Sequence, residues 1–336
     1  MHPRKSALLL FVALACLVAA DLALAAWSPF LYRQPPRNVG QQAWAGLLHR
    51  PSSIEGLDYE LAPNADLVHR EARVRTNSLG MRSPELDAVR ASGSMRIGVL
   101  GDSVAFGFGV EDDQTWSAHL QRRLESALPG RRVEVLNCAV SGYGTREERL
   151  ALEHKLLPLQ PDLVVVGYFL NDPEWEPVQQ LRNHFHAPEW WQHSEILRRI
   201  AYARRKSRIE ELGGGDLLRC YHNTAGEPWR DTVAELQRIQ AVCAERGVPV
   251  VLVLTPLLAP LEDWPSYAYA DLHAQVMQQA RALGFAAFDA TKPLAASGKS
   301  PASLRLDESH PTAEGHAIIA EGLGAWLLSQ GVLAPR

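Results

Sequence analysis

The feature that most constrains this 336-residue chain is a series of short apolar runs that alternate with amphipathic helical patterns. Two of these runs, Leu163–Phe169 and Val248–Leu254, contain no charged residue. Strands without charged residues are buried on both faces of their sheet, and their alternation with helices is typical of a parallel sheet. The sequence therefore predicts an α/β fold, a three-layer α/β/α sandwich with about five parallel strands.

The expected elements succeed one another from residue 96 onward. Strands are expected at Ile97–Leu100, Val133–Asn137, Leu163–Phe169, Val248–Leu254 and Ala286–Phe288. Helices are expected at Thr115–Leu128, Glu147–Leu157, Thr232–Arg246, Leu272–Leu283 and Thr312–Leu328. The alternation stops between Asp172 and Asp231, where a helical stretch at Ile196–Leu212 appears without any strand pattern. An insertion of this size after a strand end is expected to fold over the mouth of a pocket.

The N-terminus predicts where the protein is found. Basic residues near the start precede an apolar stretch, Ser6–Trp27, which is about as long as a helix needs to cross a bilayer. We expect residues 1–27 to be a hydrophobic helix that serves as a transmembrane anchor or signal segment. The basic end stays cytoplasmic, so a single pass places the rest of the chain outside the cytoplasm, at the cell membrane.

Two alternatives to an anchor stay open. Ala23-Leu24-Ala25 fits the small-x-small rule for a cleaved signal peptide, which would leave a secreted or periplasmic protein. Cys16 follows Leu14-Ala15, as in a lipoprotein signal. Asp21 counts against a spanning helix because a carboxylate is costly in hydrocarbon, although near the outer end it can reach the headgroups.

Residues 28–95 are rich in proline, arginine and asparagine. They contain only short strand-like pieces, around Leu57–Leu61 and Ala72–Thr76. We expect an extended linker that packs on the main domain rather than contacting substrate. The predicted organisation is therefore an N-terminal segment (1–27), this linker (28–95) and one domain at 96–330 with an insertion at about 172–231.

Composition and spacing argue against several functions. The formal net charge of −4 and the mixed signs of neighbouring charges give no basic face for nucleic acid. The Gly107-Phe108-Gly109 stretch has Asp112 where a dinucleotide-binding loop needs its third glycine. Four residues of the insertion could suggest a metal site but fit no standard ligand spacing: His184, His186, His193 and Glu189. We expect neither a metal nor an organic cofactor.

Four short motifs stand in the loops that follow predicted strands or precede the last helix. They are Gly101-Asp102-Ser103, Ser141-Gly142-Tyr143-Gly144, Gly167-Tyr168-Phe169-Leu170-Asn171-Asp172 and Asp307-Glu308-Ser309-His310-Pro311. Each has an ordinary structural explanation when taken alone. Ser103 would then cap a helix, Gly142 would serve a turn, and Asn171 would cap a strand end.

Together these residues suit acyl-transfer chemistry. A serine hydroxyl such as Ser103 is a weak nucleophile until a base removes its proton, and His310 is the candidate base. Asp307, three residues earlier, can reach the second ring nitrogen and hold the imidazole. The oxyanion formed by attack needs fixed donors, for which the backbone N–H groups of Ser103 and Gly142 and the side-chain amide of Asn171 are suited.

With these four blocks in this order, residues 96–328 resemble the SGNH (GDSL-like) hydrolase family, whose name lists this serine, glycine, asparagine and histidine. The resemblance implies a catalytic triad of Ser103, Asp307 and His310, and an oxyanion hole made by Ser103, Gly142 and Asn171. Asp102 is expected to hold the serine loop by hydrogen bonding. Two neighbouring residues are weaker candidates, since Glu308 is poorly placed to orient the imidazole and His316 is expected to be structural.

The expected function is a serine esterase that cleaves carboxylic esters through an acyl-enzyme. Its partners would be an acylated small molecule or polysaccharide of the cell envelope or extracellular space, and the membrane through the N-terminal segment. A lipase or lysophospholipase and an O-acyltransferase with the same triad stay open. A function of a different class also stays open, in which the protein is a non-catalytic member of the family that binds a glycan or a partner protein.

Overall fold

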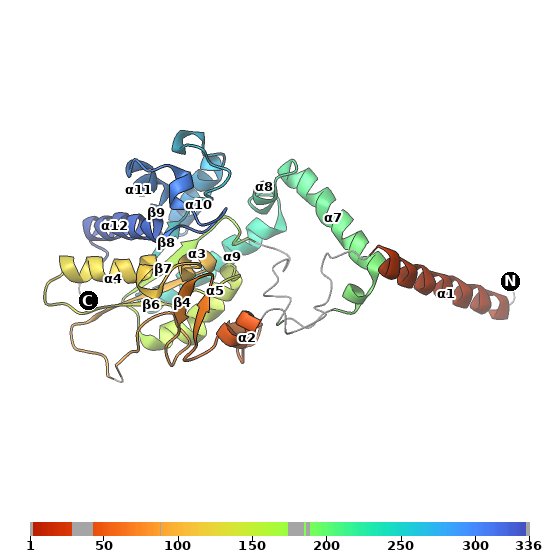
Figure 1. The fold of residues 1–336 in the computed structure, drawn as a ribbon, viewed down its shortest axis with the longest axis horizontal. Helices are drawn as coiled ribbons and strands as arrows, with labels where there is room; N and C mark the ends of the chain where they lie inside the picture. Colours follow the sequence, from red (N-terminus) through yellow and green to blue (C-terminus); the bar gives the residue numbers. More distant parts are fainter. Residues whose placement is uncertain (1–2, 29–42, 88, 174–184, 186–188, 334–336) are drawn as a thin grey trace. The chain divides into compact units, whose positions relative to one another are not determined.

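The computed structural model describes residues 3–28, 43–87, 89–173, 185 and 189–333. The chain divides into two compact units (Figure 1). One consists of Met1–Gln41 and Glu176–Cys220, and the other of Gln42–Trp175 and Tyr221–Arg336. The larger unit contains all four sequence motifs.

A five-stranded parallel sheet forms the centre of the larger unit. The strands lie in the order β6-β5-β7-β8-β9. Their bounds are β5 (Met95–Gly101), β6 (Val133–Asn137), β7 (Leu163–Tyr168), β8 (Val250–Leu254) and β9 (Ala286–Asp289). Every residue of β5, β6, β7 and β8 is buried, as the apolar runs require. The prediction of a parallel sheet with strands at these positions is confirmed.

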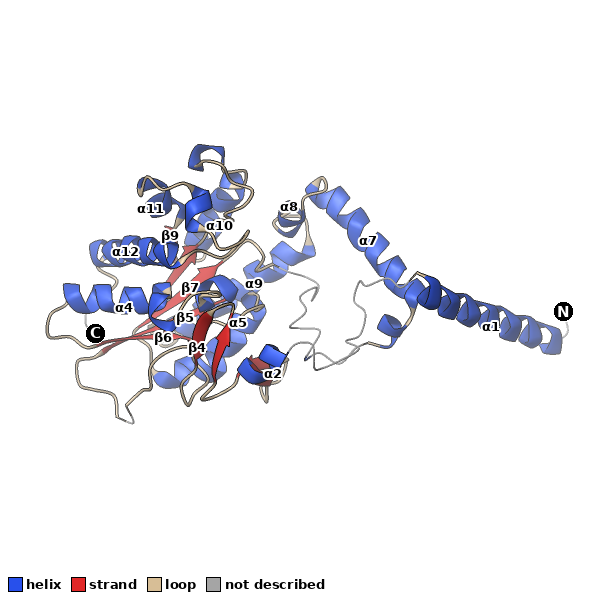
Figure 2. Cartoon of the chain, in the orientation of Figure 1, coloured by secondary structure: helices blue, strands red, loops and turns tan. Residues whose placement is uncertain are grey.

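Helices lie on both sides of this sheet (Figure 2). The longer ones in this unit are α4 (Trp116–Ala127), α9 (Glu227–Ala244), α10 (Ala270–Ala282) and α12 (Ala313–Gln330). The shorter ones are α2 (Ala43–Leu48), α3 (Ser103–Phe106), α5 (Thr145–Ala151) and α11 (Thr291–Ala296). Because α4 packs against α12 and α5 against α9, the α/β/α layering expected from the sequence is confirmed.

Two predicted helices differ from the structure at their ends. The helix expected at Glu147–Leu157 begins at Thr145 and passes after Ala151 into a π-helical turn and then a 3-10 turn. Pro158 lies in that last turn, where its missing N–H ends the regular helix. The helix expected from Thr232 begins five residues earlier because Pro228 stands in its first turn, where a proline is tolerated.

The segment before the sheet forms two β-hairpins. The first pairs β1 (His49–Pro51) with β2 (Tyr59–Leu61), and the second pairs β3 (Asp66–His69) with β4 (Ala72–Arg75). The sequence pattern indicated only β2 and β4. Their partners were missed because β1 has three residues and β3 has no fully buried side chain, so neither shows a clear alternation.

The smaller unit contains α1 (Pro3–Trp27), the 3-10 turn η5 (Trp190–His193) and α7 (Glu195–Gly213), and α8 (Leu217–Tyr221) ends at its boundary. The stretch Leu8–Trp27 has a mean hydropathy of 2.6, none of it is buried, and it is long enough to cross a membrane. The N-terminal hydrophobic helix is thus present. The idea that the insertion covers the pocket mouth stays a prediction.

Helices α1 and α7 are joined by hydrogen bonds within this unit. The Asp21 carboxylate accepts from the Ser194 hydroxyl at 2.9 Å and from the backbone N–H of Ile196 at 2.8 Å. It thereby caps the N-terminus of α7, whose first N–H groups have no partner within the helix. The one acidic residue of the apolar stretch therefore has a structural role.

Candidate active site

Ser103 is the first residue of α3 and lies two positions after the C-terminal end of β5. The chain turns sharply here at Gly101, with φ of +147°, and a Cβ on that glycine would lie 2.4 Å from the Cβ of Ala105. The side chain that caps α3 belongs to Asp102, whose Oδ1 accepts the N–H of Val104 at 2.8 Å. Asp102 therefore holds the loop as expected, and the alternative in which Ser103 is the helix cap is wrong.

The Ser103 hydroxyl, the His310 imidazole and the Asp307 carboxylate form a continuous chain of hydrogen bonds. His310 Nε2 lies 2.8 Å from Ser103 Oγ, although the two residues are 207 positions apart. His310 Nδ1 lies 2.8 Å from Asp307 Oδ1 and 2.9 Å from Oδ2. Because a carboxylate can only accept, Nδ1 carries the proton, and Nε2 is left to accept from the serine hydroxyl.

The Asp307 carboxylate is fixed and ionised. Burial alone would raise its pKa, but the hydrogen bond and charge of His310 outweigh that effect. The backbone N–H groups of Ser309 and His310 also donate to Oδ1, each at 3.0 Å, and the pKa of Asp307 is lowered to about 2. The carboxylate therefore orients the imidazole as a charged acceptor throughout the neutral pH range.

The three candidate oxyanion donors follow three neighbouring strands. Ser103 follows β5, Gly142 lies in the loop after β6, and Asn171 lies in the loop after β7. Since the strands are parallel, these loops share the carboxyl edge of the sheet, where open α/β folds bind ligands. Gly142 has φ of +82°, which only glycine adopts without strain. Burial raises the pKa of the Asp102 carboxyl, and the side chain of Asn171 is among the groups that oppose this rise, which places Asn171 near the serine loop.

A family model described as the GDSL-like Lipase/Acylhydrolase family matches residues 99–276, more than half of the chain. The chain belongs to this family. It is a serine hydrolase of carboxylic esters of the SGNH (GDSL) type, and the resemblance seen in the sequence is confirmed. The match includes Ser103, Gly142 and Asn171, and it ends before Asp307 and His310.

Several solved structures are similar to this GDSL-like hydrolase. An acetylxylan esterase from Geobacillus stearothermophilus is 17% identical with a TM-score of 0.46, covering 73% of this chain and 99% of that one. A two-domain esterase active on acetylated mannans is 15% identical with a TM-score of 0.44, covering 72% and 50%. TesA is 18% identical with a TM-score of 0.44, covering 71% and 100%. No curated protein matches the chain.

The second hairpin of the hydrolase also reaches Asp307, which the sequence did not indicate. At its tip, Arg70 Nη1 lies 3.0 Å from Asp307 Oδ2. The ring centroid of Phe108 lies 4.6 Å from that of His310 and 5.0 Å from that of His69, the last residue of β3. No motif marks these residues, because arginine, phenylalanine and histidine in such positions also suit an ordinary hairpin and loop.

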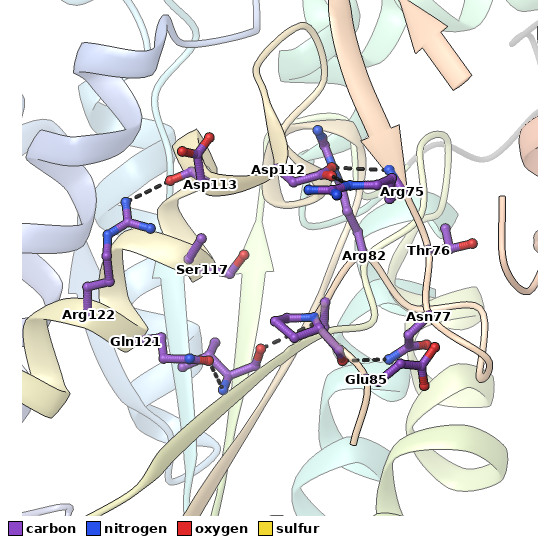
Figure 3. Close-up of a pocket in the computed structure, with 14 residues that line it drawn as sticks. Arg75, Thr76, Asn77, Arg82, Glu85, Asp112, Asp113, Ser117, Gln121 and Arg122 are labelled. Carbon is purple, nitrogen blue, oxygen red and sulfur yellow. Dashed lines mark hydrogen bonds and ion pairs between the residues drawn. The ribbon is translucent and has the colours of Figure 1, made fainter. Parts of the chain in front are cut away.

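Arg82 secures the loop that carries Phe108. Its side chain is 1% exposed, and its guanidinium donates to the carbonyl oxygens of Gly107 and Val110, each at 2.6 Å. It also pairs with Asp112 at 3.0 Å, and Arg75 of β4 pairs with the same carboxylate (Figure 3). The segment before the sheet is therefore bonded directly to a loop of the active site.

A cavity of about 500 Å³ adjoins these ion pairs (Figure 3). Its wall includes Arg75, Arg82, Asp112, Gln121 and Arg122. None of the five candidate site residues lines it. The walls of this cavity therefore do not include the candidate active site.

Besides Asp102, two buried carboxyls lie close in sequence to Gly142 and Asn171. Glu148 is in α5, shortly after Gly142, and Asp172 follows Asn171 directly. None of their four carboxyl oxygens has a hydrogen-bond partner in the described part of the chain. Burial raises the pKa of each well above its usual value, and repulsion adds to the rise, from Asp102 at Glu148 and from Glu148 at Asp172. The interior therefore favours the neutral form of both groups.

The remaining candidates have other roles. His316 is buried, accepts the N–H of Trp116 through Nδ1 at 3.2 Å, and burial lowers its pKa to about 3, so it is structural as expected. Glu308 is exposed. His184 and His186 lie outside the described residues, and among those described no three histidine, cysteine or acidic side chains gather to hold a metal ion.

Proposed function

We propose that this hydrolase is an exported serine esterase in which Ser103, His310 and Asp307 form the catalytic triad. The observation that supports this best is the chain of hydrogen bonds from Ser103 Oγ through His310 to Asp307, each about 2.8 Å long. It lies at the edge of the sheet where Gly142 and Asn171 also stand.

The geometry supports an acyl-enzyme mechanism. Ser103 Oγ attacks the ester carbonyl while its proton passes to His310 Nε2, and Asp307 stabilises the imidazolium that forms. The oxyanion accepts hydrogen bonds from the N–H groups of Ser103 and Gly142 and from the Asn171 amide. His310 then gives its proton to the departing alcohol, leaving an acyl-serine. A water molecule, deprotonated by His310, releases the carboxylic acid and restores Ser103.

Labelling with a fluorophosphonate probe tests this assignment. The probe reacts with an activated serine, so wild-type protein is expected to label and Ser103→Ala to remain unlabelled. Esterase activity should be lost in the same variant. Equal labelling of both proteins would show that Ser103 is not the nucleophile, and an unlabelled wild type would favour a non-catalytic binding protein.

The proposed substrates are O-acetylated polysaccharides of the cell envelope or extracellular space. The apolar N-terminal helix supports this choice, because a helix of this length and hydropathy suits export of the domain and such polymers lie outside the cytoplasm. The same helix also suits a lipase or lysophospholipase acting at a bilayer. Ester substrates of increasing acyl length separate the two, since an acetylesterase loses activity sharply beyond short acyl groups, whereas a lipase gains it. Transfer of the acyl group to an added alcohol would indicate an acyltransferase.

We further propose that residues 1–27 stay attached as a single-pass anchor. Cleavage after Ala25 would remove Asp21, and with it the acceptor for Ser194 and Ile196 at the start of α7. The mass of the protein extracted from membranes tests this proposal. We expect the uncleaved chain, and a mature N-terminus at residue 26 would contradict it.

A further inference from the structure

We propose that Arg70, at the tip of the hairpin formed by β3 and β4, is a positioning residue for the triad and acts through Asp307. The inference rests on the triad proposed above. It adds to the active site a part of the chain that lies outside the segment matched by the family model.

The contact with Asp307 completes the set of donors around that carboxylate. Oδ1 accepts from the N–H groups of Ser309 and His310 and from His310 Nδ1. Oδ2 shares the imidazole proton at 2.9 Å and meets Arg70 Nη1 at 3.0 Å. Among the described residues, Arg70 is the donor that bonds Oδ2 alone. It therefore adds a restraint on the plane of a carboxylate whose other donors bond Oδ1 or share both oxygens.

Arg70 supports the imidazole from a second side as well. Its guanidinium carbon lies 4.7 Å from the centroid of the Phe108 ring, within the range of a cation–π contact. That ring lies 4.6 Å from His310. One side chain thus contacts both of the groups that flank the imidazole, the carboxylate and the aromatic ring.

The hairpin can hold Arg70 in place because its own geometry is well defined. Asp66 pairs with Arg75 and His69 with Ala72, so the turn consists of Arg70 and Glu71 alone. Both residues have positive φ, +48° and +66°, as in the tight turns that suit the twist of a two-residue hairpin. At its base the hairpin is bonded to Asp112 through Arg75. The turn of this hairpin therefore holds the Arg70 side chain where it contacts Asp307.

The contacts of Arg70 assign it a supporting role. Its guanidinium reaches Asp307 and the Phe108 ring, and Asp307 is linked to Ser103 through His310. The side chain is 56% exposed and the Asp307 side chain 33% exposed, so the pair contributes little to folding. Its effect should therefore appear in the rate of the chemical step rather than in stability.

The same hairpin offers a matched control. Arg73 also pairs with an acidic residue, Asp66, through contacts of 2.6 and 2.8 Å, and both side chains are about half exposed. This pair contacts neither Asp307 nor Phe108 in the bonds described. A substitution at Arg73 removes a surface ion pair between the two strands of this hairpin and leaves the contacts of Asp307 and His310 intact.

The test measures kcat and KM of the full-length protein in detergent, with p-nitrophenyl acetate as the probe. Arg70→Ala should lower kcat by roughly five- to ten-fold and leave KM within about two-fold, because one supporting contact of a catalytic group is lost. Arg70→Lys, which keeps the charge, should recover most of the rate. Arg73→Ala should match wild type, and melting temperatures should be alike in all variants.

A double-mutant cycle shows whether Arg70 acts through Asp307. In an Asp307→Ala background, Arg70→Ala should change the rate by less than about two-fold, because the partner is already gone. An equal loss in both backgrounds would overturn the inference, as would an Arg70→Ala variant that behaves like Arg73→Ala. A rise in KM alone would assign Arg70 to substrate contact instead.

Ser103→Ala in the same assay separates this inference from the proposed function. If that variant is inactive while Arg70→Ala has the wild-type kcat, the triad stands and the role of Arg70 is refuted. If Ser103→Ala keeps full activity, the proposed triad itself fails, and the positioning role fails with it.

Discussion

Two regions of the hydrolase meet at His310, and they are built in opposite ways. The strand-end loops carry Ser103, Gly142 and Asn171 on a buried parallel sheet, and the glycines and caps around them fix the backbone. The second hairpin, β3 and β4, is partly exposed, carries ion pairs on its surface, and reaches the site through Arg70. In the first region the chemistry of acyl transfer requires particular residue types. In the second region a side chain needs only a positive charge and enough length to contact the Asp307 carboxylate.

The largest effect should come from removing the charge that orients the base. Asp307→Asn keeps the shape of the side chain, but its amide can present an N–H to His310 and so favour the wrong tautomer. We expect kcat to fall by about 10³ to 10⁴, as in serine proteases, with the melting temperature nearly unchanged. Steady-state kinetics measure this loss. Unchanged turnover would remove Asp307 from the triad and also leave Arg70 without a target.

The next effect concerns the proposed oxyanion hole. Asn171→Ala removes one donor and should lower kcat by about 10² or more, while KM changes little, because the oxyanion forms only along the reaction path. Ser103 should still react with a fluorophosphonate, more slowly than in wild type. If kcat stays within two-fold of the wild type, roughly 0.4 kcal/mol of activation energy, Asn171 is only a strand-end cap.

The residues of the proposed triad could be predicted from the sequence, whereas Arg70 could not. Ser103, His310 and Asp307 were found because acyl transfer requires their residue types, and the structure brings them together within hydrogen-bond distance. The sheet was predicted because each central strand is wholly apolar. Arg70 could not be found in this way, since no spacing relates the tip of a hairpin to a residue 237 positions away.

The buried carboxyls were missed for a similar reason. Glu148 lies in an amphipathic helix where a glutamate is ordinarily solvent-exposed, and its burial depends on how α5 packs, which local sequence does not fix. Asp172 belongs to the motif that contains Asn171, but nothing in the spacing indicates that its side chain points into the interior. Tertiary packing decided both positions.

A smaller effect tests whether the segment before the sheet supports the loop that carries Phe108. Arg82→Met removes a buried guanidinium that bonds the carbonyl oxygens of Gly107 and Val110. We expect stability to fall by about 2 kcal/mol, since hydrogen bonds to a buried charge are lost, and activity to fall with it as Phe108 loses support. Arg122→Met, in the wall of the same cavity, is the control and should change stability by less than about 0.5 kcal/mol. Chemical denaturation compares the two, and equal losses would contradict a special role for Arg82.

The smallest effect is a change in how stability depends on pH. The folded protein holds Glu148 protonated at pH values where the unfolded chain has released that proton, because the pKa of Glu148 is raised in the fold. Its contribution to stability is therefore fully present below the unfolded pKa and is lost as pH rises toward the folded value. Glu148→Gln cannot ionise, so its melting temperature relative to wild type should increase between pH 5 and pH 8.

Glu125→Gln provides the matched control for this comparison. Glu125 is exposed on α4, and replacing it should leave the difference in melting temperature the same at both pH values. A pH-independent difference for Glu148→Gln as well would show that the glutamate is ionised in the folded protein. Asp172→Asn should behave as Glu148→Gln does, since the two groups repel each other.

The long separation of the residues that meet at His310 has a consequence for synthesis. The ribosome synthesises the hairpin and Ser103 well before His310, which follows Ser103 by 207 positions. A nascent chain that has not yet reached Asp307 and His310 therefore lacks both groups of the proposed triad that activate the serine. The proposed site can form only after these late positions have folded back onto the sheet.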